Sequence, residues 1–452
     1  MGEAFVGGAP WLAAWRIRGW PENGTRRVWA VLIATRLPRK DICTAPEHCE
    51  RNMKPVLIAG GGIGGLTLAI SLARHGIASH ILEARPALTR EGAGIQLGPN
   101  ATRILQTLDV TPALGGHVVS PEYIAVNDGR SGHELTRLPL GAWLEERHGA
   151  PYWVVHRAAL HDALQSAVAK EPLVTLEMGR ALVAIDDAAG LERAAITAHV
   201  SDGGDATGSI LVGADGLWSR ARAHVAPAAK LTYSGMVAAR ARVARDAAGT
   251  PFSGTGAAQR AGWTGVWLAP NAHIVHYPVE GGDQIALVAI CKLAEPSDGW
   301  STQIGTDEIA RRFGHMPDAI TQLLKKADNW QQWPLFTLSK ATHWSRGRCV
   351  LIGDAAHPIL PFLAQGGALA IEDAFELAGA IGRARRDPAC AIKTFVNHRR
   401  QRVAGVQAAS AANGRTYHLD GAGAFARNMA LRLAPRHALM KRYDWIYGYR
   451  SG

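Results

Sequence analysis

The stretch Pro55-Val-Leu-Ile-Ala-Gly-Gly-Gly-Ile-Gly-Gly-Leu66 is an apolar run followed directly by a glycine-rich turn. The apolar residues predict a buried strand over 55–59, with a helix over 66–75 and a second strand over 78–82. Strand, turn, helix and strand form a βαβ unit, so we expect an α/β fold with a parallel sheet near its start.

The glycines of the turn match the pattern G-x-G-x-x-G at Gly60, Gly62 and Gly65. The first permits a tight turn, the second lets the backbone approach a pyrophosphate, and the third lets the helix pack on the strand. Glu83 follows Gly65 by 18 residues at the end of the second strand, where a carboxylate can bind ribose hydroxyls. The pattern predicts a dinucleotide site made of Gly60, Gly62, Ile63, Gly64, Gly65, Glu83 and Arg85.

Two later segments also run from an apolar strand into a polar turn. The first is Ile210-Leu-Val-Gly-Ala-Asp-Gly-Leu-Trp-Ser-Arg-Ala-Arg222, which contains Asp215-Gly216. The second is Cys349-Val-Leu-Ile-Gly-Asp-Ala-Ala-His-Pro358, which contains Asp354 and continues through Pro361 and Gln365-Gly-Gly367 into a helix expected over 366–382. A carboxylate at a strand end beside a helix N-terminus can accept hydroxyl groups, or it can cap the helix.

With these three ordered motifs, residues 54–449 resemble the class A single-component FAD-dependent aromatic hydroxylases, and among them the salicylate-hydroxylase-like branch. The resemblance implies a Rossmann-type FAD-binding domain interleaved with a β-sheet substrate domain and followed by C-terminal helices. It also implies that the glycine turn and Glu83 hold the ADP half of FAD, and that Asp354 binds the ribityl chain. It further implies that Asp215 and Gly216 belong to a motif associated with both FAD and NAD(P)H. The remaining flavin contacts it implies are Arg103, Arg157, Pro361, Gly366 and Gly367.

The family reduces its FAD with NADH or NADPH, captures O2 as a flavin C4a-hydroperoxide and hydroxylates an aromatic ring. Because the chain holds one dinucleotide fingerprint, NAD(P)H is expected as a transient co-substrate. The implied substrate is a small phenolic or N-heteroaromatic acid. An FAD-dependent epoxidase or other oxidoreductase of this fold, and a non-catalytic flavin-binding protein, are the alternatives.

Catalytic candidates lie on the expected strand Ala272-His-Ile-Val-His-Tyr-Pro-Val279. His273 and Tyr277 are four residues apart, so both side chains point to one face of a strand and His276 to the other. In related hydroxylases this pair lines the substrate pocket, with the histidine as the base. A buried core histidine explains His273 equally well. The apolar segment 359–364 and the residues before Arg240 depart from the family pattern, which leaves the substrate open.

The chain divides into three expected parts. Residues 1–53 form an extension without periodicity, predicted to be disordered or adventitious. Residues 54–382 form the FAD-binding domain, interleaved with a substrate-binding β-sheet region at about 120–160 and 230–295. Residues 383–452 form a basic helical region, in which a helix is expected over 391–412.

Composition narrows the function further. The C-terminal part holds 14 Lys and Arg against three Asp and Glu, which accounts for the whole net charge of +11, and it carries no groove-reading motif, so no nucleic-acid partner is expected. No apolar run spans a bilayer, and five scattered cysteines, of which Cys43 and Cys49 lack a second ligand pair, predict a cytoplasmic protein without a metal site. The sequence does not indicate an oligomeric state.

Overall fold

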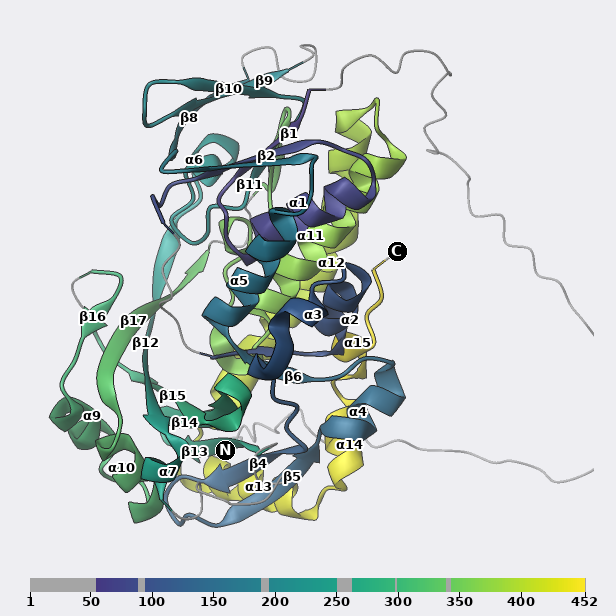
Figure 1. The fold of residues 1–452 in the computed structure, drawn as a ribbon. Helices are drawn as coiled ribbons and strands as arrows, with labels where there is room; N and C mark the ends of the chain where they lie inside the picture. The colour runs from purple at the N-terminus through teal and green to yellow at the C-terminus, as the bar shows by residue number, and fades with distance from the viewer. Residues whose placement is uncertain are drawn as a thin grey trace, which may run out of the picture. The chain divides into compact units, whose positions relative to one another are not determined.

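The computed structural model describes residues 54–87, 94–187, 195–249, 262–296, 299–338 and 343–451, which belong to one compact unit (Figure 1). The extension 1–53, with Cys43 and Cys49, lies outside the described residues. The C-terminal helices are part of the same compact unit. In the described ranges, no helix has both the length and the apolar composition to cross a membrane.

The predicted βαβ unit is the centre of a six-stranded sheet in the order β18-β19-β11-β1-β2-β7. All neighbouring strands are parallel except the edge pair β18 and β19. Strands β1, β11 and β19 are buried throughout, as expected for a parallel sheet covered on both faces. The strands are β1 (Val56–Ala59), β2 (Ser79–Glu83), β7 (Val174–Met178), β11 (Leu211–Gly213), β18 (Ser345–Arg346) and β19 (Cys349–Leu351).

Helix α1 (Ile63–Arg74) packs against α5 (Arg157–Val168) and α11 (Gly366–Arg383) beside this sheet. It begins three residues before the predicted start at residue 66 because Gly62 is already its N-cap. The bounds of α11 differ from the predicted 366–382 by one residue.

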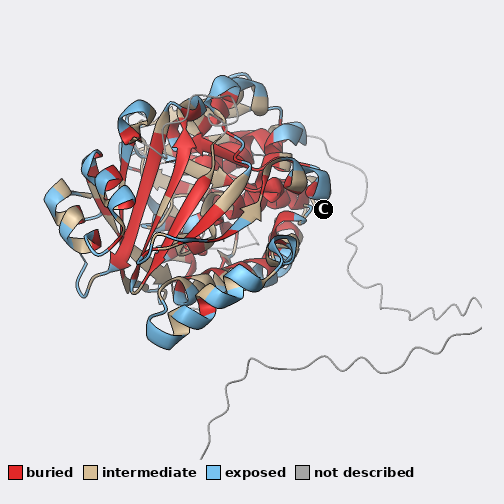
Figure 2. Cartoon of the chain, turned by 90° about the horizontal axis from the view of Figure 1, so that it is seen from below, coloured by how far each residue is buried: buried red, intermediate tan, exposed pale blue. Residues whose placement is uncertain are grey.

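The second large element is an eight-stranded sheet in the order β16-β17-β12-β15-β14-β13-β4-β5. It contains strands from both regions in which the sequence predicts the substrate-binding sheet. One face packs on α9 (Thr306–Phe313) and α10 (Asp318–Lys325), and the other on the segment around Phe362 and the C-terminal residues. Figure 2 shows these strands mostly buried, with exposed helix faces around them. The strands are β4 (Tyr123–Asp128), β5 (Glu134–Pro139), β12 (Leu231–Ala244), β13 (Thr264–Ala269), β14 (Ala272–Val279), β15 (Gln284–Lys292), β16 (Thr302–Gln303) and β17 (Asp328–Leu338).

The C-terminal part of the chain consists of helices. Helix α12 (Pro388–Tyr417) is longer than the predicted 391–412, because Pro388 occupies its first turn and the Asp387 carboxylate accepts a hydrogen bond from the Cys390 N–H at 2.9 Å. Its buried residues recur every three or four positions and pack on α11. The helices that follow are α13 (Gly421–Leu433), α14 (Arg436–Lys441) and α15 (Asp444–Tyr447).

Smaller elements complete the described fold. A three-stranded sheet consists of β8 (Leu182–Asp186), β9 (Ile196–Val200) and β10 (Asp205–Gly208), and β3 (Gly94–Leu97) pairs with β6 (Trp153–His156).

Candidate active site

The turn between β1 and α1 has the geometry that its glycines require. Gly60 has φ +105°, and a Cβ there would lie 2.6 Å from the Ala214 carbonyl oxygen of the adjacent segment. A Cβ on Gly65 would lie 2.0 Å from the Gly60 carbonyl oxygen, so only glycine lets α1 come this close. A Cβ on Gly62 would meet no atom within 4 Å, so this side of the turn is open for a ligand.

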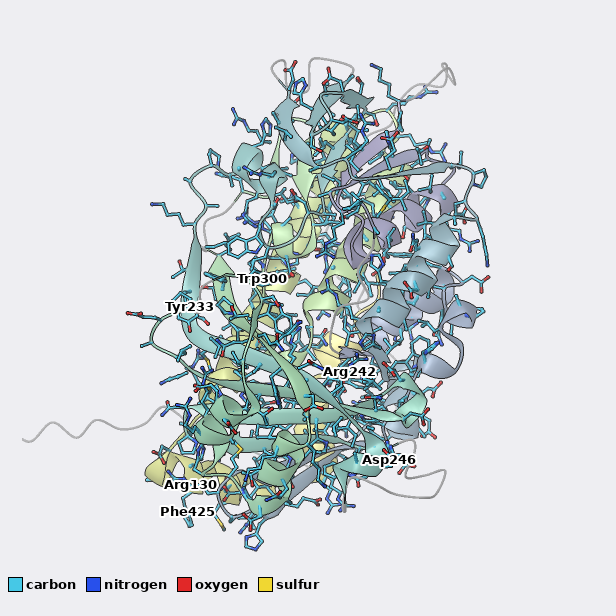
Figure 3. The ribbon with its side chains drawn as sticks, turned by 60° about the vertical axis from the view of Figure 1, so that its left-hand side comes forward. Arg130, Tyr233, Arg242, Asp246, Trp300 and Phe425 are labelled. Atoms are coloured by element: carbon cyan, nitrogen blue, oxygen red, sulfur yellow. The ribbon has the colours of Figure 1, made fainter. Side chains whose placement is uncertain are left out.

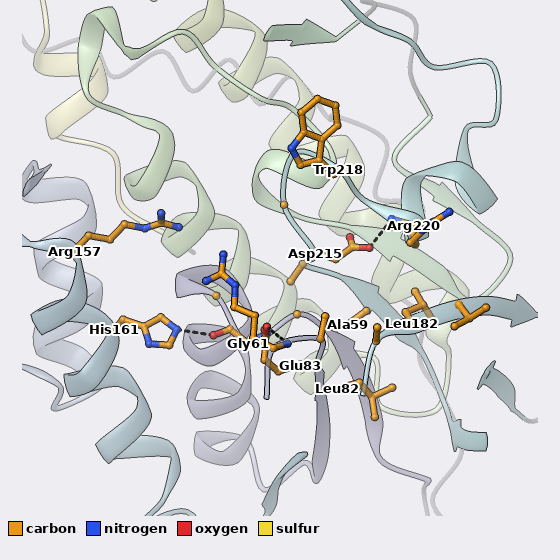
Figure 4. A pocket seen from close by; sticks show the side chains of 18 of the residues that line it. Ala59, Gly61, Leu82, Glu83, Arg157, His161, Leu182, Asp215, Trp218 and Arg220 are labelled. Atoms are coloured by element: carbon orange, nitrogen blue, oxygen red, sulfur yellow. Dashed lines mark hydrogen bonds between the residues drawn. The ribbon is translucent and has the colours of Figure 1, made fainter. Parts of the chain in front are cut away.

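Glu83 joins this turn to the end of β2. Its Oε2 accepts a hydrogen bond from the Gly61 N–H at 2.6 Å, and its Oε1 accepts one from the Arg85 N–H at 2.9 Å. On the opposite side, a ring nitrogen of His161 in α5 lies 2.7 Å from the Gly61 carbonyl oxygen (Figure 4). No sequence motif points to His161, because its partner is a backbone atom 100 residues away.

A cavity of about 590 Å³ opens above the turn (Figure 4). Backbone N–H groups at a helix N-terminus attract phosphate, and arginine side chains at the rim add positive charge. This donor set fits the pyrophosphate and ribose of a dinucleotide. The predicted site residues that line the cavity are Gly60, Gly62, Glu83, Arg85, Arg157, Asp215 and Gly216.

Asp215 has a structural task at the edge of this cavity. Its Oδ2 accepts hydrogen bonds from the Arg220 and Ala221 N–H groups at 2.7 and 3.0 Å, which caps α6 (Arg220–Val225). Gly216 has φ +73° and open space beside it. Trp218 follows at the rim, and it contacts Trp300 edge-on with ring centroids 5.5 Å apart; Figure 3 shows where Trp300 lies.

Arg222 connects the two later motifs. Its guanidinium donates to the carbonyl oxygens of Leu217, Asp354 (3.4 Å) and Ala355 (3.1 Å). The turn after β11 and the turn after β19 are therefore held together by one buried arginine. The sequence shows this arginine, but only the folded chain shows its partners.

Asp354 lies in a 3-10 turn (Gly353–Ala355) directly after β19. Its side chain is partly open to solvent, but the protein packed around the carboxyl desolvates it and raises its pKa. His357, Arg157 and Arg222 oppose the increase. No described residue donates a hydrogen bond to the carboxylate. Asp354 thus offers a free acceptor near Arg157, which itself lines the cavity.

The loop after Asp354 leads into α11. Pro361 begins a second 3-10 turn (Pro361–Leu363), and the buried Gln365 accepts a hydrogen bond from Asn100 Nδ2 at 3.0 Å. Gly366 begins α11, and a Cβ on Gly367 would lie 2.4 Å from Ile95 Cδ1. A Cβ on Gly64 of α1 would lie 3.5 Å from the Ala370 Cβ of α11, and Ile63 is buried. These residues shape the site without lining the cavity.

A buried ion network lies under this loop. Asp373 accepts hydrogen bonds from the Gly353 N–H at 2.9 Å, from His357 Nε2 at 2.5 Å and from Arg399 Nε at 2.8 Å. Burial acts to raise the pKa of Asp373, but His357 and Arg399 lower it below its usual range. The turn that presents Asp354 is therefore fixed to α12.

Glu372 extends the network. It accepts hydrogen bonds from Asn100 Nδ2 at 2.6 Å and Arg402 at 2.8 Å, and Arg399 lies 2.7 Å from it. Arg402 also donates to the carbonyl oxygens of Trp445 and Ile446. The network thus fixes the C-terminal segment as well.

The catalytic candidates share one face of the eight-stranded sheet. Arg240 in β12 pairs with Val288, which pairs with Val275, and His273 and Tyr277 lie two residues to either side of Val275. Directly opposed residues face the same side of a sheet, so Arg240, His273 and Tyr277 point together toward Phe362 of the flavin loop. His276 points to the other face, as predicted. None of the three lines the cavity.

His273 and Tyr277 are both buried, with exposed fractions of 1% and 4%. Tyr277 donates its hydroxyl hydrogen bond to the Gly94 carbonyl oxygen at 2.8 Å, and burial raises its pKa to about 12, with Arg240 opposing. His273 Nδ1 lies 2.7 Å from His418 Nε2, and burial places the pKa of His273 well below its ordinary value. Both side chains are neutral at pH 7.

Arg240 is another residue that the sequence analysis does not select as a site residue. Its guanidinium lies over the Trp333 ring at 5.1 Å, and its buried Nε has no hydrogen-bond partner among the described residues. Burial lowers its pKa, and the neighbouring Arg157 lowers it further. An arginine within an apolar strand was the only available signal.

Arg103 is not brought to the cavity. Its guanidinium donates to the carbonyl oxygens of Tyr449, at 2.9 Å, and His148. Arg103 therefore holds the C-terminal segment against α2 (Pro99–Thr107) and α4 (Gly141–His148).

Known proteins share this fold along its length. A salicylate hydroxylase in complex with substrate has a TM-score of 0.73 at 24% identity, over 88% of this chain and 96% of that one. An HpxO variant from Klebsiella pneumoniae complexed with FAD has a TM-score of 0.76 at 25% identity, over 89% and 100% of the two chains.

Proteins with similar sequences are also named as hydroxylases or monooxygenases. 3-Hydroxybenzoate 6-hydroxylase 1 of Aquipseudomonas alcaligenes is 35% identical over 396 residues, covering 87% of this chain and 97% of the relative. 6-Hydroxynicotinate 3-monooxygenase of Bordetella bronchiseptica is 31% identical over 369 residues, covering 78% and 90%. Residues 53–410 match the family described as FAD binding domain. The chain therefore belongs to the FAD binding domain family, and it is an FAD-dependent aromatic hydroxylase of the kind that its motifs resemble.

Proposed function

We propose that this enzyme hydroxylates the ring of a small aromatic acid that carries both a carboxylate and a ring hydroxyl, with NADH or NADPH and O2. Bound FAD supplies the oxygen-transfer chemistry. The chain's own residues bind the acid, exclude water and accept a proton. The two curated relatives above are named for hydroxybenzoate and hydroxynicotinate, which have these two groups.

The proposal depends on one observation, which is that the charge of Arg240 has no anionic partner among the described residues. Arg240 is half-buried, its Nε is buried without a hydrogen-bond partner, and no described residue pairs with its charge. Such a cation is costly, and a substrate carboxylate or phenolate would satisfy it. Arg240 shares its sheet face with His273 and Tyr277, so the three side chains border the same region of the sheet. His273, neutral and buried, is the proposed base for the ring hydroxyl.

The residues that contact FAD are also part of this proposal. The glycine turn, Glu83, Arg85 and Arg157 would hold the ADP half, and Asp354 the ribityl chain. The exposed Trp218 at the cavity rim supplies a stacking surface for the visiting nicotinamide dinucleotide. We place the reaction in the cytoplasm, because the described cysteines Cys291, Cys349 and Cys390 are free.

The test compares Arg240→Met with Arg242→Met. Arg242 is an exposed cation two residues along the same strand, ion-paired with Glu280 (Figure 3). We expect Arg240→Met to raise the KM for 3-hydroxybenzoate about 10- to 100-fold, since charge-assisted hydrogen bonds contribute roughly 1.5–3 kcal/mol.

The methyl ester of the same acid controls for the ring. Its KM should change little in Arg240→Met, and Arg242→Met should behave as the unaltered enzyme with both compounds. If Arg240→Met keeps the wild-type preference for acid over ester, Arg240 does not bind the carboxylate.

A further inference from the structure

A second histidine touches the proposed base. His418 is the C-cap residue of α12, and its Nε2 lies 2.7 Å from His273 Nδ1, with ring centroids 4.9 Å apart. The rings of Phe362 and Tyr417 flank His273 at centroid distances of 5.5 and 5.3 Å. One imidazole must donate and the other accept, so the pair shares a proton.

The two rings differ in exposure. His273 is 1% exposed, while His418 is only partly buried. His273 contacts His418 through its Nδ1, which leaves Nε2 for a substrate hydroxyl. The pair therefore reaches from the buried sheet face toward solvent.

The surroundings disfavour an additional proton, and therefore a positive charge, on the His273–His418 pair. Burial, Lys292 of β15 and Arg427 of α13 lower the pKa of His418 to about 4. Arg427 is held there by the carbonyl oxygens of Thr416 and Tyr417, at 3.1 and 2.9 Å. Burial raises the pKa of the neighbouring Tyr417, so its hydroxyl stays protonated. Burial lowers the pKa of Arg427, and Asp128 opposes this decrease.

We propose that His418 is a positioning residue that fixes the tautomer of His273 and passes the substrate proton between His273 and solvent. This inference rests on the proposed function. In the resting pair His273 Nδ1–H donates to His418 Nε2, which leaves a lone pair on His273 Nε2. When the ring hydroxyl gives its proton to Nε2, the Nδ1 proton moves to His418 Nε2 and the His418 Nδ1 proton leaves to water. When the product forms, one proton returns from water by the same path and passes from His273 Nε2 to the phenolate oxygen. The product then leaves as its phenol, and both histidines regain their resting tautomers.

The experiment uses the FAD-loaded enzyme with 3-hydroxybenzoate. Proton release on binding is followed by stopped flow with a pH indicator, and product formed per NADH consumed is measured in turnover. His418→Ala should slow proton release and lower the product yield per NADH at least about 10-fold. Added imidazole should restore both, because the partly exposed site can admit it, whereas flavin content should not change. The exposed His315, replaced by Ala, is the matched control and should leave both readouts unchanged.

Three outcomes would contradict this inference, and each contradicts a different part of it. Wild-type proton release and coupling in His418→Ala would remove His418 from the proton path. Loss that imidazole fails to restore but His418→Gln does restore would make His418 a structural residue only. If instead the unaltered enzyme forms no product, or His273→Gln stays fully coupled, the proposed function or its base is at fault.

Discussion

Asp354 combines an exposed carboxylate with a raised pKa and no hydrogen-bond donor among the described residues. A carboxyl whose folded pKa is raised disfavours folding when it ionises, so its charge is a cost to the FAD-free protein. Such a cost is typical of residues kept for ligand binding.

We therefore predict opposite effects of Asp354→Ala on binding and on stability. FAD affinity should fall about 10- to 100-fold, from the loss of roughly 1.5–3 kcal/mol of hydrogen bonding to the ribityl hydroxyls. The melting temperature of the FAD-free protein should stay equal or rise. Titration of FAD with the FAD-free protein and thermal unfolding measure the two effects. An unchanged FAD dissociation constant would remove Asp354 from the site.

At this scale the sequence predicts residues whose roles depend on local chain geometry. Gly60, Gly65 and Glu83 act within one βαβ unit, and their neighbours follow from it. Arg240 and His418 could not be predicted. The neighbours of Arg240 depend on the register of the sheet, and those of His418 depend on where the long helix α12 ends. Arg103 resembles a family position, yet its guanidinium binds the C-terminal segment.

Helices α11 and α12 act together as the support for the flavin loop. Glu372 and Asp373 lie on α11, whereas Arg399 and Arg402 lie on α12 more than 25 residues later, and only the packing of the two helices joins them. The predicted helix begins at residue 391, whereas α12 begins at Pro388, because the Asp387 side chain caps the helix and proline is tolerated in the first turn.

Arg399→Met should leave both buried carboxylates undercompensated. Breaking a buried ion pair costs about 3–5 kcal/mol, so we expect a clear drop in melting temperature and weaker FAD retention, since Gly353 is held by Asp373. Lys393→Met, an exposed substitution on the same helix, is the control. If Arg399→Met does not fold, Arg399→Lys should give a smaller loss of the same kind. Wild-type stability in both variants would contradict the role of the network.

The acid stability of the whole molecule should reflect its buried histidines. Burial lowers the pKa of His276 to about 3, and that of His418 to about 4 with the help of Lys292 and Arg427. The unfolded chain binds protons below the ordinary histidine pKa of about 6.5, while the folded chain does not until far lower pH. Folding stability contributed by these neutral histidines is therefore present above pH 6.5 and is lost as pH falls toward 4 and then 3.

Each such histidine should change the free energy of unfolding by up to about 1.4 kcal/mol per pH unit in this window. Urea unfolding midpoints between pH 7 and pH 5 measure the slope. His276→Gln should flatten it, whereas the exposed His315→Gln should not. A midpoint independent of pH over this range would show that these histidines are protonated in the folded state.

The most direct test of the central claim is isotope tracing with the FAD-loaded enzyme under 18O2. NADH or NADPH is supplied with 3-hydroxybenzoate or 6-hydroxynicotinate, and the product is identified by mass spectrometry. We predict that aromatic acid accelerates NAD(P)H oxidation and that the product gains one oxygen atom, which comes from O2. Flavin bound without acceleration and without labelled product from either acid would contradict the account and favour a non-catalytic flavin-binding protein.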